Sequence, residues 1–123
     1  MTKDIFNKGM AVRREVLGEQ HVDRAESNKD KFTEEFQELI TKYAWGEIWT
    51  RPGLERKTRS CITLAMMIAL HREDEFKLHI KAALNNGLSK DEIKEVILQS
   101  AIYAGVPAAN SAFHWAQDVF NNL

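Results

Sequence analysis

Apolar residues recur at intervals of three and four along most of this 123-residue chain, a spacing typical of amphipathic helices. The pattern predicts helices over about 3–17, 30–43, 55–70, 73–86, 89–104 and 107–120. No run of β-branched residues alternates cleanly with polar ones, so no strand is expected. We therefore predict an all-α fold, a compact bundle of about six helices in a single domain over residues 1–123.

Local signals mark where several of these helices begin and end. Glycines follow three of them, at the position that commonly caps a helix C-terminus: Gly18, Gly87 and Gly105. Ser89 and Glu92 have the spacing of a capping box, and Pro107 suits the first turn of the last helix. Gly46 interrupts the second pattern and Pro52 forces a turn, so we expect a loop over residues 45–53.

The apolar faces predict which residues are buried. The second helix gathers its large apolar residues on one face: Phe32, Phe36, Leu39, Ile40 and Tyr43. The last helix has a similar stripe: Ala109, Ala112, Phe113, Ala116 and Phe120. The helix at 55–70 is apolar all round in its second half, which predicts that protein surrounds it. Because one short chain offers few neighbours for such a helix, we expect a partner subunit.

Composition narrows the class of protein mainly by exclusion. The formal net charge of −1 provides no basic field, so no nucleic-acid partner is expected. Cys61 is the one cysteine, so neither an intramolecular disulfide nor a multi-cysteine metal site is expected. The N-terminal residues do not resemble a signal peptide, and the longest apolar run, residues 61–70, would span about 15 Å, half of a bilayer core. We therefore expect a cytoplasmic protein with no membrane contact.

Some polar residues stand out because a helical bundle does not need them. Glu47 and Arg51 are flanked by Trp45 and Trp49, and they form either a loop ion pair covered by aromatic rings or part of an apolar pocket wall. Cationic residues also begin the helix at 55–70: Arg56, Lys57 and Arg59. Their charge opposes the helix dipole, which a bound anion would relieve, but a solvated charged turn is the more common explanation of such residues.

Two further candidate groups contain histidine. His79 follows Glu75 by four residues, so the carboxylate can reach and orient the imidazole, although a histidine at a core edge is commonly structural. Asn110 and His114 lie one turn apart on the last helix and form either a pocket wall or a polar surface stripe. No histidine or acid has metal-ligand spacing, so no metal site is expected.

Several ordered blocks of sequence resemble the carboxymuconolactone decarboxylases. They cover residues 43–54, 57–60, 63–66, 79, 82–87, 92–96 and 102–113, within a likeness that runs from about Gly9 to Phe120. The resemblance implies an AhpD-like all-α fold, shared with a peroxidase-like superfamily and assembled as a homo-oligomer, usually a trimer or hexamer. It also implies cofactor-free decarboxylation of 4-carboxymuconolactone to 3-oxoadipate enol-lactone, in the catabolism of protocatechuate and related aromatic acids.

The redox branch of that superfamily carries a Cys-x-x-Cys pair just upstream of its helix histidine. Arg72 and Glu75 hold those places here, and Ser60 holds the place of an acidic residue that the redox branch also carries. Thiol peroxidase activity is therefore disfavoured.

Decarboxylation of an anionic lactone requires groups that bind the carboxylates, a hydrogen-bond donor to the developing oxyanion and a proton for carbon. Arg51 and Arg59 are the candidates for binding the carboxylates, because a guanidinium pairs with them bidentately. His79 is the candidate oxyanion donor or general acid, and Glu47 would pass the proton or orient a neighbour. We expect His79, Glu47 and Arg51 to be catalytic, and the substrate-binding residues to be Arg59, Trp45, Trp49, Asn110 and His114.

Two other interpretations of the sequence stay open. An enzyme of the same fold would act on a different lactone or keto acid, and a panel of substrates separates this case. A non-catalytic helical oligomer would bind a small acid tightly without releasing carbon dioxide.

Overall fold

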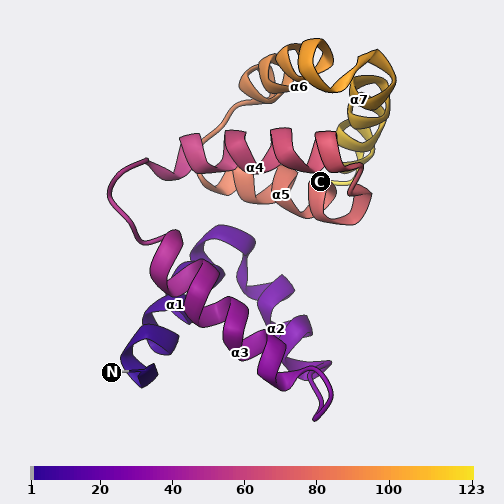
Figure 1. Cartoon of the computed structure of the whole chain (residues 1–123). Helices are drawn as coiled ribbons and strands as arrows, with labels where there is room; N and C mark the ends of the chain where they lie inside the picture. The colour runs from indigo at the N-terminus through magenta and orange to yellow at the C-terminus, as the bar shows by residue number, and fades with distance from the viewer. Residues whose placement is uncertain (1) are drawn as a thin grey trace. The chain divides into compact units, whose positions relative to one another are not determined.

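A computed structural model describes residues 2–123, without the side chain of Thr2, and within this range it contains helices and no strand. The all-α prediction is confirmed for these residues. The chain forms two compact units that divide between Glu55 and Arg56. Figure 1 shows the helices in chain order, from indigo at the N-terminus to yellow at the C-terminus. None of the helices in the described range combines the length and apolar character that a bilayer span requires.

The first unit contains α1 (Thr2–Leu17), α2 (Glu19–Ser27), α3 (Glu34–Ile40) and η1 (Thr41–Ile48). Helix α3 continues directly into η1, a wide π-helical segment in which N–H groups reach back five residues instead of four. The Trp49 N–H, for example, donates to the Ala44 carbonyl at 2.9 Å. Short π-helical segments are frequent at functional sites.

Three sequence expectations for this unit are wrong. Helix α2 was not expected, and residues 45–48 belong to η1 instead of a loop. The predicted apolar face is largely exposed, with Phe32 94% and Tyr43 59% accessible, and Phe36 and Leu39 are exposed as well. The buried apolar residues of the unit are instead Val12, Val16, Leu17, Val22 and Trp45. Periodicity identifies an apolar face, but it does not say what covers that face.

Gly46 does not interrupt the helix, because it lies in a close contact between η1 and α1. A Cβ atom on Gly46 would lie 2.7 Å from the Ile5 carbonyl oxygen, and one on Gly9 would lie 2.1 Å from the Thr41 carbonyl oxygen. Real Cβ atoms do not approach backbone this closely. The two helices therefore touch backbone to backbone, which requires glycine on both sides.

The second unit contains α4 (Arg56–Leu70), α5 (Glu73–Asn85), α6 (Lys90–Ala104) and α7 (Val106–Asn121). Its core is one cluster drawn from all of these helices, including Leu64, Phe76, Ile93 and Ala112. The expected ends are confirmed: Ser89 and Glu92 form a capping box, and Gly87, at φ 99°, closes α5. His71 takes the same left-handed conformation, at φ 58°, after α4.

One burial prediction for the second unit is wrong and another stays untested. Within this chain α4 exposes Ile62, Met66 and Leu70, so the expectation that a partner subunit completes its surroundings stays a prediction. Phe113 is 37% exposed, and Val119 occupies the core in the same helix. Spacing at three and four residues does not show whether the residues at the edge of an apolar stripe are buried. The neighbouring helices determine which of them are covered.

The contact between α1 and η1 predicts the effect of adding one methyl group. Gly9→Ala should lower the free energy of unfolding by about 3 kcal/mol, because the new methyl group meets backbone that cannot move aside. Gly53→Ala is the matched control, since its Cβ would meet nothing within 4 Å, and it should change stability by less than about 0.5 kcal/mol. Urea unfolding of both variants measures the difference. Equal stabilities would show that the helices are not in backbone contact.

Candidate active site

The stacked tryptophans form the most defined feature of the candidate site in the first unit. Trp45, in η1, is buried, and Trp49, just after η1, is half-buried. Their ring centroids lie 5.0 Å apart and their planes differ by 30°, a stacked arrangement that favours both rings. The sequence analysis named both residues as substrate-binding candidates, and that assignment stays a prediction.

Glu47 and Arg51 are both exposed and come from the same stretch of chain as the tryptophans. The backbone around them is held locally: the Thr50 hydroxyl donates to the Gly46 carbonyl at 2.6 Å, and the Arg51 N–H donates to the Ile48 carbonyl at 3.1 Å. The carboxylate and the guanidinium are thus presented by an ordered segment next to an aromatic pair.

In the second unit, the start of α4 carries the cationic group. Lys57 forms an ion pair with Glu92 at 3.3 Å, which ties the start of α4 to the start of α6. Arg59 is half-buried and its Nε atom is buried. A half-buried guanidinium suits an anion better than a fully solvated one would, because less water competes for its donors.

Next to Arg59 lies a polar contact that the sequence analysis missed. Ser60 is fully buried, and the Asn86 side-chain amide donates a hydrogen bond to its hydroxyl oxygen at 2.8 Å. The bond joins the start of α4 to the end of α5. Asn86 immediately precedes the helix-ending Gly87, but no spacing in the sequence links it to a residue 26 positions away.

His79 is half-buried on α5, with its Nδ1 atom buried, and lies on the same helix face as Asn86. Glu75, expected to orient it, accepts a hydrogen bond from Arg72 at 2.6 Å. Arg72 is the largest influence that lowers the pKa of Glu75, and the charge of His79 adds a smaller effect in the same direction. The Glu75 carboxylate is therefore bonded to Arg72, and its role in orienting the imidazole stays a prediction.

Asn110 and His114 are exposed on α7, on the solvent side of the helix opposite its buried alanines. Their role as a pocket wall stays a prediction.

The structure thus gathers Trp45, Glu47, Trp49 and Arg51 within the first unit. The second unit holds Arg59, His79, Asn110 and His114.

An apolar groove of about 550 Å³ lies between α4 and α6, and none of the predicted site residues lines it. Cys61 lines it, and burial raises the pKa of the thiol, which makes Cys61 a poor nucleophile at neutral pH. Among the described residues, no three His, Cys, Asp or Glu side chains lie close enough together to hold a metal ion.

The fold defines an all-α protein, and comparison with known proteins identifies its family. The model of the carboxymuconolactone decarboxylase family matches residues 34–118, which span the boundary between the two units. The chain belongs to this family. The resemblance seen in the sequence is thereby confirmed.

Two relatives cover nearly the whole chain. A 4-carboxymuconolactone decarboxylase of Acinetobacter baylyi is 52% identical over 118 residues, 96% of this chain and 88% of that protein. A nitrosuccinic acid decarboxylase of Metarhizium robertsii is 42% identical over 97% of this chain and 83% of its own. A 4-carboxymuconolactone decarboxylase of Pseudomonas putida is 49% identical over 45 residues, 37% of this chain.

The bond between Ser60 and Asn86 predicts a measurable contribution to stability. Ser60→Ala removes the acceptor and leaves a half-buried amide to find water, so the free energy of unfolding should fall by about 1 kcal/mol. Ser27→Ala is the control, because the Ser27 hydroxyl is exposed and bonds only within its own helix, to the Arg24 carbonyl. Urea unfolding compares the two, and an equally small effect for both would contradict a structural role for the buried pair.

Proposed function

We propose that this chain is a carboxy-lyase that removes carbon dioxide from 4-carboxymuconolactone and gives the enol-lactone of 3-oxoadipate. The observation that carries the proposal is 52% identity, over 96% of the chain, with a protein named for that reaction. The two compared chains have similar lengths, since 88% of the relative is covered. This reaction belongs to the catabolism of protocatechuate.

The substrate supplies its own electron sink in this reaction. The departing carboxylate sits on a carbon that is conjugated through a double bond with the lactone carbonyl. When the carbon–carbon bond breaks, its electron pair moves into that carbonyl and forms a dienolate, and one proton then adds to carbon. No electron leaves or enters the system, so a cofactor is not needed. The protein has to hold an anion, stabilise an oxyanion and deliver a proton.

Residues of the chain offer groups suited to each of these tasks. Arg51 and Arg59 would hold substrate carboxylates, because guanidinium groups bind them with paired hydrogen bonds. His79 would donate to the oxyanion or protonate carbon, and Glu47 would relay the proton. The Trp45–Trp49 stack supports this assignment by offering an apolar surface beside Glu47 and Arg51. The remaining substrate contacts would come from Asn110 and His114.

The proposal includes assembly as a homo-oligomer, a trimer or a hexamer, in the cytoplasm. Large apolar side chains remain exposed on α4 and α6: Ile62, Met66, Leu70, Leu98, Ile102 and Tyr103. Large exposed apolar surface on a protein is commonly covered by another protein surface. Assembly of identical chains would cover it without a further partner.

A second candidate substrate class is favoured by the fungal relative, which is named a nitrosuccinic acid decarboxylase. In a nitro acid, the nitro group would accept the electron pair in place of the lactone carbonyl. The demands on the protein are otherwise the same, as they would be for another lactone or a keto acid.

A spectroscopic assay of the purified protein with 4-carboxymuconolactone tests the proposal. We expect release of carbon dioxide at a rate that a chelator does not change. Turnover of nitrosuccinate or a keto acid with none of 4-carboxymuconolactone would overturn the substrate assignment. Tight binding of the lactone without release of carbon dioxide would identify a non-catalytic binding protein.

Substitutions at two of the proposed site residues should separate their roles. His79→Ala should lower kcat roughly 100- to 10,000-fold with a small change in KM, because it removes proton transfer or oxyanion donation. Arg51→Ala should chiefly raise KM, because it removes a contact that the enzyme makes equally with the bound substrate and with the transition state. Arg24→Ala, on an exposed face of α2, is the control. Wild-type kinetics in both site variants would remove the assignment.

A further inference from the structure

A guanidinium group that is not among the predicted site residues is buried in the first unit. Arg13, on α1, is only 3% exposed, and its Nε atom is buried without a hydrogen-bond partner. Burial is also the main cause that lowers its pKa. Burying a charge is unfavourable unless the group is well bonded, so its position calls for a reason other than stability.

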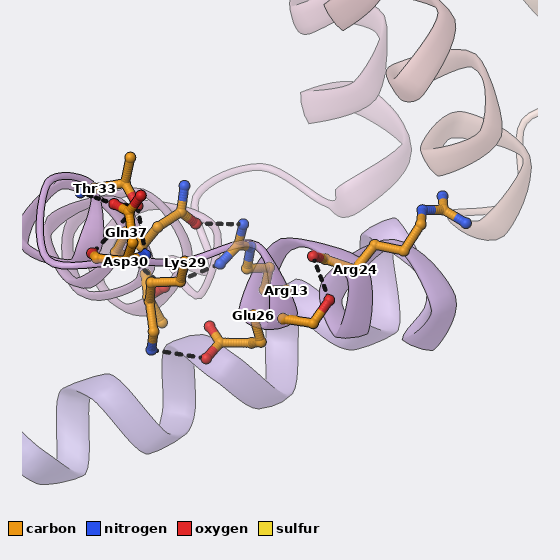
Figure 2. Close-up of polar contacts among 9 residues, drawn as sticks. Arg13, Arg24, Glu26, Lys29, Asp30, Thr33 and Gln37 are labelled. Atoms are coloured by element: carbon orange, nitrogen blue, oxygen red, sulfur yellow. Dashed lines mark hydrogen bonds and ion pairs between the residues drawn. The ribbon is translucent and has the colours of Figure 1, made fainter.

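The hydrogen-bond partners of Arg13 are neutral. Its Nη2 donates to Gln37 Oε1 at 3.1 Å, and its Nη1 donates to the Thr41 hydroxyl oxygen at 3.4 Å. That hydroxyl in turn donates to the Gln37 carbonyl at 2.7 Å, which closes a small network. Figure 2 shows Arg13 reaching Gln37 while the nearby Glu26 carboxylate is held by Lys29, at 2.9 Å. No carboxylate therefore bonds directly to Arg13 among the contacts of the described residues.

Both partners lie where the helix changes its width. Gln37 belongs to the last turn of α3, and Thr41 is the first residue of the wide segment η1. One turn earlier on the same face of α1, Gly9 lies against the Thr41 carbonyl oxygen and the Gly46 backbone nitrogen. Helix α1 thus holds the first wide turn twice, through its backbone at Gly9 and through a side chain at Arg13.

We propose that Arg13 is a positioning residue for the candidate site, because it fixes the point at which the helix widens and so sets the direction of Trp45, Glu47 and Trp49. A wide turn contains an additional residue, so moving its start rotates every later side chain about the helix axis. A misplacement of about 1 Å can reduce the rate of an enzyme about 100-fold. The inference rests on the proposed function, because the proposed function assigns Glu47 and the tryptophans to the site.

Kinetics of Arg13→Met test the inference, because methionine keeps much of the length and none of the donors. We expect kcat/KM to fall about 10- to 100-fold, mainly through kcat, measured well below the unfolding transition. Val22→Ala is the matched control: it removes buried methyl groups from α2 of the same unit and lowers stability while leaving the network intact. Arg24→Met, an exposed arginine, controls for the loss of charge.

A second readout does not depend on substrate. The Trp45–Trp49 stack should give an exciton signal in circular dichroism, which Arg13→Met should weaken and Val22→Ala should keep. Arg13→Lys keeps the charge but cannot bond both acceptors as a fork, so its kcat should lie between those of wild type and Arg13→Met. It also replaces the methionine variant if that variant does not fold.

The outcomes distinguish this inference from the proposed function. An Arg13→Met or Arg13→Lys protein with wild-type kcat and an unchanged tryptophan signal would overturn the positioning role while leaving the decarboxylase assignment intact. An equal loss of kcat in Val22→Ala would also overturn it, since general destabilisation would then explain the effect. If the wild-type protein releases no carbon dioxide from 4-carboxymuconolactone, the proposed function fails, and the tryptophan signal alone decides the role of Arg13.

Discussion

The backbone contact between α1 and η1 is the constraint on which the first unit depends. It exists because neither Gly9 nor Gly46 has a Cβ atom, so the helices approach more closely than side chains would allow. Close approach then places Arg13, one turn further along α1, within reach of Gln37 and Thr41. The wide turn begins at Thr41, beside both this backbone contact and the buried guanidinium, and the tryptophan stack follows it along the chain.

The second unit is held in a different way, by local helix ends and by one buried polar bond. Helix α6 begins with a capping box, backbone hydrogen bonds close the C-terminal ends of α5, α6 and α7, and the Ser60–Asn86 bond joins α4 to α5. Arg59 and His79 lie on these well-anchored helices. Chemistry that depends on charge and on proton delivery, without a cofactor, needs groups whose positions are fixed before the substrate arrives.

The sequence predicted the second unit much better than the first, because its signals are local. A capping box and a glycine in the left-handed region act within a few residues, so the bounds of α4 to α7 followed closely from the pattern. Gly46 was misread as an interruption of the helix, because the glycine is needed for a contact with Gly9, 37 positions away. The candidate residues could be named from the family likeness, but the Ser60–Asn86 bond and the Arg13 network depend on packing that no spacing in the sequence encodes.

The short turn between α4 and α5 has a consequence for the order in which the chain folds. His71 reverses the chain there, and the Arg72 N–H donates back to the Met67 carbonyl at 2.9 Å, so the two helices meet through contacts between residues close in sequence. Contacts of this kind form early, because little chain entropy is lost in closing a short loop. The contact between Gly9 and Gly46 closes a much longer loop. We therefore expect the helical hairpin of α4 and α5 to gain amide protection first in a pulsed hydrogen-exchange experiment, and the segment that carries the tryptophan stack to be completed later.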